Sequence, residues 1–171
     1  MALLSGMIVT ACSNQATAGV TPSPTPSPPA TPPAAAILES GCGSTPVYGG
    51  SIPKWLDDAV GHNSPGTPFV ITHPPIAGGF LFTHPLRAGH PTNPGNKVLW
   101  AVGPTRNGST LYIDVHPFRA SSPNIHEEHI ANSGPGNIYP DGVDVPTAGC
   151  WQFDLRWATY HAQVELNYTS S

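Results

Sequence analysis

The last part of the chain alternates between apolar and polar residues, and no other feature restricts its fold as strongly. Every second residue of Cys150–Trp157 is Trp, Phe or Leu, and every second residue of His161–Tyr168 is apolar or aromatic. Because successive side chains of a strand point to opposite faces, the pattern predicts two strands with one buried and one solvated face. The short connection Ala158–Tyr160 predicts that they form a hairpin. Trp151 and Trp157 are therefore expected in the core.

Further apolar runs, separated by Gly, Pro, Asn and Ser, follow Cys42. Lys97–Val102 and Thr110–His116 flank an Asn-Gly pair, which is typical of a hairpin turn. Less regular strands are predicted at Phe69–Thr72, Gly79–Thr83, Ile125–Ile130 and Val143–Val145. Ser51–Val60 is the one predicted helix, with Ser51 as its cap. Seven or eight short strands of this kind predict an all-β fold, a sandwich of two sheets.

The first 38 residues carry none of the 16 charged residues of the chain. Residues 1–11 include the apolar run Ala2–Ala11, which is shorter than the about 20 residues needed to span a bilayer and suits an export signal. Val9–Cys12 resembles the lipobox of bacterial lipoproteins. This resemblance implies cleavage before Cys12 and acylation of its thiol. The alternative is a short buried helix with an ordinary cysteine.

Residues 12–38 hold seven of the 22 prolines, all between Pro22 and Pro33. Proline fixes φ and lacks a backbone donor, so this segment is predicted to be a disordered, polyproline-like tether. It would hold residues 39–171, the predicted sandwich domain, away from a membrane. A docking motif for a partner or a plain linker is the alternative.

Two cysteines remain once Cys12 is assigned to a lipid. In an exported domain, Cys42 and Cys150 are more readily explained as a disulfide than as two buried thiols. The bridge would join the start of the domain to its penultimate strand.

Two further segments, NKVLWAV at Asn96–Val102 and VDVPTAGCWQFDLRW at Val143–Trp157, resemble uncharacterised bacterial secreted lipoproteins. Those proteins combine a lipobox, a low-complexity linker and a small immunoglobulin-like β-sandwich. The resemblance implies an architecture and a location in the cell envelope, and it implies no activity.

Eight histidines make metal binding worth considering. Asp114 and His116 share one face of a predicted strand, and zinc or copper accepts such ligands. His126 and His129 would share a face on a helix but point to opposite faces of the predicted strand. Surface histidines without a metal are the simpler interpretation.

Other function classes find less support. A net charge of −4 with six scattered basic residues argues against nucleic acid as a partner. No nucleophile elbow or phosphate-binding glycine loop occurs, so we expect no catalysis. Tyr112 and Tyr139 are the aromatic residues predicted to contact a ligand. The sequence thus predicts a lipid-anchored, extracytoplasmic, non-catalytic binding module with an unknown ligand. A zinc or copper protein of the cell envelope is the alternative.

Overall fold

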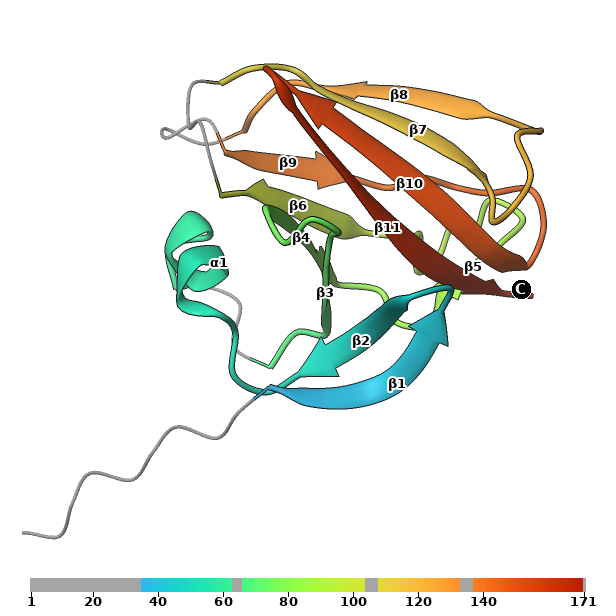
Figure 1. Cartoon of the computed structure of the whole chain (residues 1–171). Helices are drawn as coiled ribbons and strands as arrows, with labels where there is room; N and C mark the ends of the chain where they lie inside the picture. The colour runs from blue at the N-terminus through green and yellow to red at the C-terminus, as the bar shows by residue number, and fades with distance from the viewer. Residues whose placement is uncertain (1–34, 63–65, 104–107, 133–136, 171) are drawn as a thin grey trace, which may run out of the picture. The chain divides into compact units, whose positions relative to one another are not determined.

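The computed structural model describes residues 35–62, 66–103, 108–132 and 137–170. Two sheets pack against each other, with one short helix outside them (Figure 1). The six-stranded sheet consists, in spatial order, of β1 (Ala36–Cys42), β2 (Thr45–Gly49), β3 (Phe69–Ile71), β4 (Ala77–Leu81), β6 (Val98–Val102) and β9 (Ile138–Asp141). The five-stranded sheet consists of β5 (Leu86–Arg87), β11 (Tyr160–Thr169), β10 (Gly149–Trp157), β7 (Leu111–Pro117) and β8 (Ile125–His129). The predicted all-β sandwich is confirmed, with eleven strands among the described residues instead of seven or eight.

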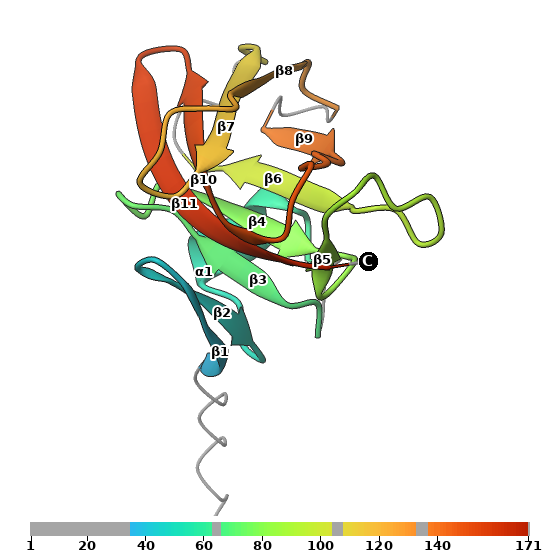
Figure 2. The ribbon, with the colours of Figure 1, turned by 90° about the vertical axis from the view of Figure 1, so that its right-hand side faces the viewer.

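The predicted C-terminal hairpin is confirmed. β10 and β11 pair antiparallel from Gly149 opposite Tyr168 to Trp157 opposite Tyr160, so the connection is two residues long instead of three. The inward residues of β10 are buried, as the alternation predicts, including both tryptophans. Figure 2 shows the two long strands running side by side beside β7.

The predicted hairpin of Lys97–Val102 with Thr110–His116 is wrong. β6 pairs with β4 and β9 in one sheet, whereas β7 pairs with β10 and β8 in the other. The chain therefore crosses from sheet to sheet between them. Residues 104–107, which include the Asn of the predicted turn, lie outside the described residues.

Aromatic side chains from both sheets fill the main core. The ring of Trp100 on β6 lies 5.8 Å from the ring of Phe153 on β10, measured between centroids. Gly79, opposite Trp100 on β4, makes room for that indole, because a Cβ there would lie 2.6 Å from its ring. Trp100 also donates from Nε1 to Asp141 at 2.8 Å. Packing of these rings across the sheets is what holds the sandwich together.

The helix α1 (Lys54–Ala59) is shorter than the predicted Ser51–Val60. Its first turn is closed by the carbonyl of Pro53, which accepts from the backbone N–H groups of Leu56 and Asp57, so the predicted cap at Ser51 is wrong. Leu56 and Ala59 pack against the outer side of the six-stranded sheet in a second, smaller core. Val143–Val145, predicted as a strand, lies outside the strands, although Val143 and Val145 are buried.

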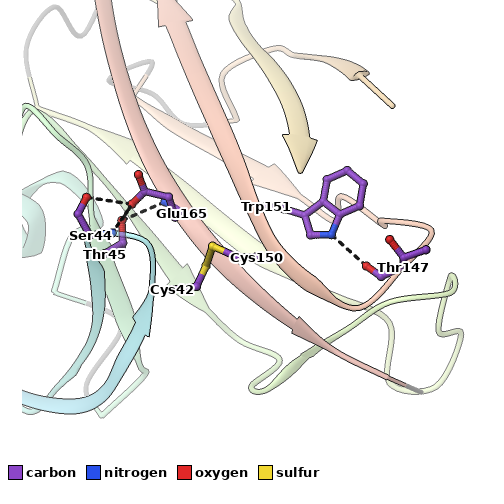
Figure 3. Close-up of a disulfide and its surroundings, with 7 residues drawn as sticks. All are labelled: Cys42, Ser44, Thr45, Thr147, Cys150, Trp151 and Glu165. Atoms are coloured by element: carbon purple, nitrogen blue, oxygen red, sulfur yellow. Dashed lines mark hydrogen bonds between the residues drawn. A yellow bond between two sulfur atoms is a disulfide. The ribbon is translucent and has the colours of Figure 1, made fainter. Parts of the chain in front are cut away.

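The predicted disulfide between Cys42 and Cys150 is confirmed, and it joins β1 of one sheet to β10 of the other (Figure 3). Such a bond indicates an oxidising, extracytoplasmic environment. Beside it, Oε2 of Glu165 accepts from the hydroxyl groups of Ser44 and Thr45 at 3.2 and 2.6 Å. The β1–β2 hairpin is thus fastened to the five-stranded sheet by a covalent bond and by hydrogen bonds.

The predicted N-terminal segments fall mostly outside the described residues. Cys12 and the proline-rich run are among the residues that the structure does not describe, so their assignments stay predictions. β1 begins at Ala36, so Ala36–Leu38, assigned from the sequence to the tether, belongs to the sandwich. Within the described ranges, no helix is long and apolar enough to cross a membrane.

Candidate functional site

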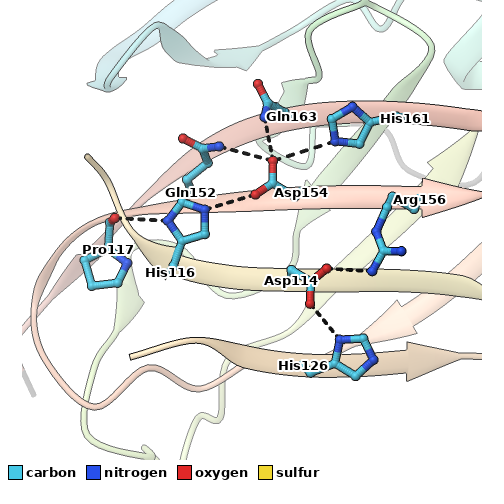
Figure 4. A network of polar contacts seen from close by, with 9 residues as sticks. All are labelled: Asp114, His116, Pro117, His126, Gln152, Asp154, Arg156, His161 and Gln163. Atoms are coloured by element: carbon cyan, nitrogen blue, oxygen red, sulfur yellow. Dashed lines mark hydrogen bonds and ion pairs between the residues drawn. The ribbon is translucent and has the colours of Figure 1, made fainter. Parts of the chain in front are cut away.

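The solvated face of the five-stranded sheet carries a network of hydrogen-bonded polar and charged side chains. On β7, the inward side chains Leu111, Ile113 and Val115 are buried, so the alternate positions point outward as predicted. β8, β10 and β11 add outward residues in register with them. We call this group the polar face; its members are Tyr112, Asp114, His116, His126, Gln152, Asp154, Arg156, His161 and Gln163. Figure 4 shows all of them except Tyr112.

Asp114 is one of the two centres of the polar face. Its Oδ1 lies 2.7 Å from Nδ1 of His126 on β8, and its Oδ2 accepts from Nη2 of Arg156 on β10 at 2.6 Å. Burial raises the pKa of Asp114, but the hydrogen bonds from His126 and Arg156 outweigh it, so the net shift is downward. The carboxylate is therefore held in its ionised form with a fixed orientation.

Asp154 is the other centre. Its Oδ2 lies 3.0 Å from Nε2 of His116, and its Oδ1 accepts from the side-chain amides of Gln152 and Gln163 at 3.1 and 2.6 Å. His161 lies on the same side, with Nε2 at 3.8 Å from Oδ1. One carboxylate thus orders side chains from all three central strands of the sheet (Figure 4).

His116 has an acceptor at each ring nitrogen. Burial lowers its pKa, but Nδ1 donates to the carbonyl of Pro117 at 3.2 Å and Nε2 faces the Asp154 carboxylate. Both partners can only accept, so the protonated imidazolium satisfies them best. The net effect raises the pKa of His116 above its ordinary value of 6.5.

The predicted metal ligands do not gather at one point. Asp114 and His126 are in contact, but His116 pairs with Asp154 instead of Asp114. His129 points away from the polar face and lies 3.4 Å from Asp141, as the strand interpretation implied. Among the described residues, no group of three or more His, Cys, Asp and Glu side chains is arranged to hold a metal ion.

The two predicted tyrosines differ in exposure. Tyr112 lies on the polar face, where its ring stacks near that of His126 at 6.4 Å and the Arg156 guanidinium lies 5.8 Å from its centroid. Tyr139 is wrong as a ligand contact, because it is fully buried and donates from its hydroxyl to the carbonyl of Ser109 at 2.8 Å. Burial also raises the pKa of the Tyr139 phenol.

Sequence reasoning missed five members of the polar face: Gln152, Asp154, Arg156, His161 and Gln163. The alternation of Cys150–Trp157 already placed Asp154 and Gln152 on the solvated face. Only the register of β7, β10 and β11 shows that their side chains meet. Comparison of the chain with models of protein families, with curated proteins and with solved structures gives no match.

Proposed function

We propose that this chain is a lipid-anchored extracytoplasmic lipoprotein whose β-sandwich is a non-catalytic binding module. Acylated Cys12 would hold it on the membrane, and the proline-rich residues 13–35 would act as its stalk. Two features support the location: the lipobox-like Val9–Cys12 and the Cys42–Cys150 disulfide, which belongs to an oxidising compartment.

The polar face carries the proposal for binding. Its carboxylates, amides and guanidinium are held in place by contacts with one another, so that little side-chain freedom remains to be lost when a ligand binds. Tyr112 supplies an aromatic surface next to them. Hydrogen-bond donors and acceptors next to the Tyr112 ring suit an extended, hydroxyl-rich ligand. We therefore propose a polysaccharide of the cell envelope as the ligand class.

The anchor is tested by phase partitioning of the full chain expressed in a bacterial host. The wild type is expected in the detergent phase, and the Cys12→Ala variant in the aqueous phase, because alanine has no thiol to carry the lipid. A Ser44→Ala variant, which leaves Cys12 in place, is the control. A Cys12→Ala protein that stays in the detergent phase contradicts the lipid anchor.

Binding is tested by co-sedimentation with insoluble envelope polysaccharide. Tyr112→Ala and Gln163→Ala are each expected to lower the affinity about tenfold, which corresponds to the loss of about 1.4 kcal/mol. Phe82→Ala is the matched control, because Phe82 is a half-exposed aromatic residue at the end of β4 and belongs to no part of the polar face. Equal affinities for all three variants contradict the proposed face.

Zinc or copper binding is the second candidate. The observation in its favour is that Asp154 has imidazole nitrogens on two sides, from His116 at 3.0 Å and His161 at 3.8 Å. A small movement of His161 would let an ion take both nitrogens and the carboxylate. Calorimetry decides this point: no binding of either ion below about 10 μM dismisses the candidate.

A further inference from the structure

A cavity of about 230 Å³ lies where the β1–β2 hairpin meets the five-stranded sheet, and of its lining residues Glu165 is paired across β10 and β11 with Gln152 of the polar face. Apolar side chains form part of its wall. Titratable side chains enter it from three separate segments, namely Glu39 on β1, Glu165 on β11 and His84 between β4 and β5. The apolar part of the wall consists of Val47, Leu81, Pro85, Leu86 and Leu166.

Glu165 is fixed by the hairpin. Its Oε2 accepts from the backbone N–H and the hydroxyl of Ser44, both at 3.2 Å, and from the hydroxyl of Thr45 at 2.6 Å. The backbone N–H of Glu165 in turn donates to the Thr45 hydroxyl at 2.9 Å. Among the described residues, the hydrogen bonds to the Glu165 carboxylate all use Oε2, which leaves Oε1 able to accept from a ligand (Figure 3).

The backbone of β1 is irregular on both sides of Glu39. Its register with β2 shifts between Ile37 and Glu39, and again between Glu39 and Cys42. Gly41, two residues after Glu39, has a φ of 65°, and a Cβ there would lie 1.8 Å from the carbonyl oxygen of Thr45. Such bulges redirect single side chains and are frequent at functional sites. In β1, the two register shifts flank Glu39, whose carboxylate lines the cavity.

His84 has one satisfied and one unsatisfied nitrogen. Nε2 lies 2.9 Å from Oε1 of Glu39, whereas Nδ1 is buried and has no hydrogen-bond partner among the described residues. A buried nitrogen without a partner is costly and calls for a bound group. With the proton on Nε2 donated to Glu39, Nδ1 presents a lone pair that needs a donor.

We propose that this cavity binds a primary ammonium group on a short alkyl chain. An ammonium has three donors and no acceptor, and the cavity is lined by two carboxylates, those of Glu39 and Glu165, and by His84, whose buried Nδ1 has no hydrogen-bond partner among the described residues. The described lining residues include no Lys or Arg to compensate the carboxylates, and their leucine and valine side chains suit the alkyl part. At about 30 Å³ per water-sized group, the volume accommodates roughly eight non-hydrogen atoms. A free alkylamine and a lysine side chain of a partner both have this chemistry.

The proposal is tested by titrating the full chain with pentylammonium chloride and following backbone amide NMR signals at pH 7.5. Saturable shifts are expected at Gly41, Leu86 and Asn167, which line the cavity, with a Kd of about 1 mM for so small a ligand. 1-Pentanol and pentanoate, which match its shape without its charge, are expected to bind at least about tenfold more weakly. Nα-acetyl-lysine N-methylamide separates the two sources, because tighter binding of this compound identifies a lysine side chain.

Variants complete the test. Glu39→Gln and Glu165→Gln are each expected to weaken pentylammonium binding at least about tenfold. Asp58→Asn on α1 removes one negative charge away from the cavity and is expected to bind as the wild type does. Because Glu165 also holds the β1–β2 hairpin, thermal unfolding is recorded for every variant. Should Glu165→Gln prove unstable, the affinity of Glu39→Gln decides the test. The proposal is overturned if no saturable shift occurs up to about 20 mM, if 1-pentanol binds equally well, or if Glu39→Gln leaves the affinity unchanged.

Discussion

The disulfide between Cys42 and Cys150 is expected to account for a large part of the stability of the sandwich. It closes a loop with a sequence separation of 108 residues. In the chain-entropy model, removal of a crosslink of that span lowers the free energy of unfolding by about 4.8 kcal/mol at 25 °C. Since a domain of this size is stable by about 5–15 kcal/mol in total, the double variant Cys42→Ala, Cys150→Ala should be marginally stable.

The folded state keeps other contacts at the same place, so the loss is expected to come from the unfolded chain. Glu165 still accepts hydrogen bonds from Ser44 and Thr45, and Val47 still packs in the main core. Without the crosslink the unfolded ensemble expands, so the urea m-value should rise while the midpoint falls. Urea unfolding followed by fluorescence of the buried tryptophans measures both quantities.

The controls separate the crosslink from the loss of the sulfur atoms. All proteins carry Cys12→Ala, so that none is acylated, and the wild-type pair is also measured after reduction by a phosphine. The reduced protein and the double variant should lose the same free energy of unfolding within about 1 kcal/mol. A loss below about 1 kcal/mol in both would refute the reasoning, because it would mean that the bridge does not constrain the unfolded chain.

Three further predictions follow from single residues. Because its acceptors raise the pKa of His116 above 6.5, the stability that His116 contributes is present below pH 6.5 and is lost as the pH rises through the folded pKa. NMR titration of His116 and urea midpoints across this pH range measure the loss. Asp154→Asn should remove most of this pH dependence of stability. Burial raises the pKa of Asp141, so the wild type should lose stability relative to Asp141→Asn as the pH rises from 3.8 to the folded pKa; parallel thermal unfolding of the two proteins decides this. Ala158 has a φ of 47° in the β10–β11 turn, and Ala158→Gly should therefore stabilise the protein by about 0.5–1 kcal/mol, whereas an equal or lower melting temperature contradicts the strain.

Local periodicity was sufficient to predict one region of the fold. The alternation of β10 and β11 predicts which side chains enter the core, and the structure buries Trp151 and Trp157 accordingly. The same holds for Leu111, Ile113 and Val115 of β7. In each case one face of the strand meets the core and the other meets solvent, so the period of two survives in the sequence.

Strand pairing was harder to predict, because a strand covered on both sides loses its alternation. β6 is buried at four of its five positions, since the main core covers one side and the helix α1 with its neighbours covers the other. The Asn-Gly signal after it suggested a local hairpin, and pairing with β4 and β9 prevailed. A run of consecutive apolar residues is typical of an interior strand with two neighbours, and this could have argued against the hairpin.

β9 was missed because Pro140 and Asp141 are unfavourable in strands. It lies at the edge of the six-stranded sheet, where proline is tolerated. This placement also explains why Tyr139 faces the core and not a ligand. Val143 and Val145 show the opposite error, because they alternate and are buried but form no strand. The carbonyl of Val143 accepts from the Tyr168 hydroxyl and that of Val145 from the backbone N–H of Gly89, so neither belongs to a ladder of backbone hydrogen bonds between strands.

The polar face illustrates why partners cannot be assigned from one strand alone. Asp114 and Asp154 lie directly opposite each other on β7 and β10, a position in which two like charges repel. Each is compensated by a different cation, Arg156 for Asp114 and His116 for Asp154. The sequence placed Asp114 and His116 on one face of a strand, and only the register shows that His116 pairs with Asp154. Asp114 and Asp154 therefore keep their hydrogen-bonding groups in place through their own partners, and such ordered donors and acceptors suit the neutral, hydroxyl-rich ligand that we propose.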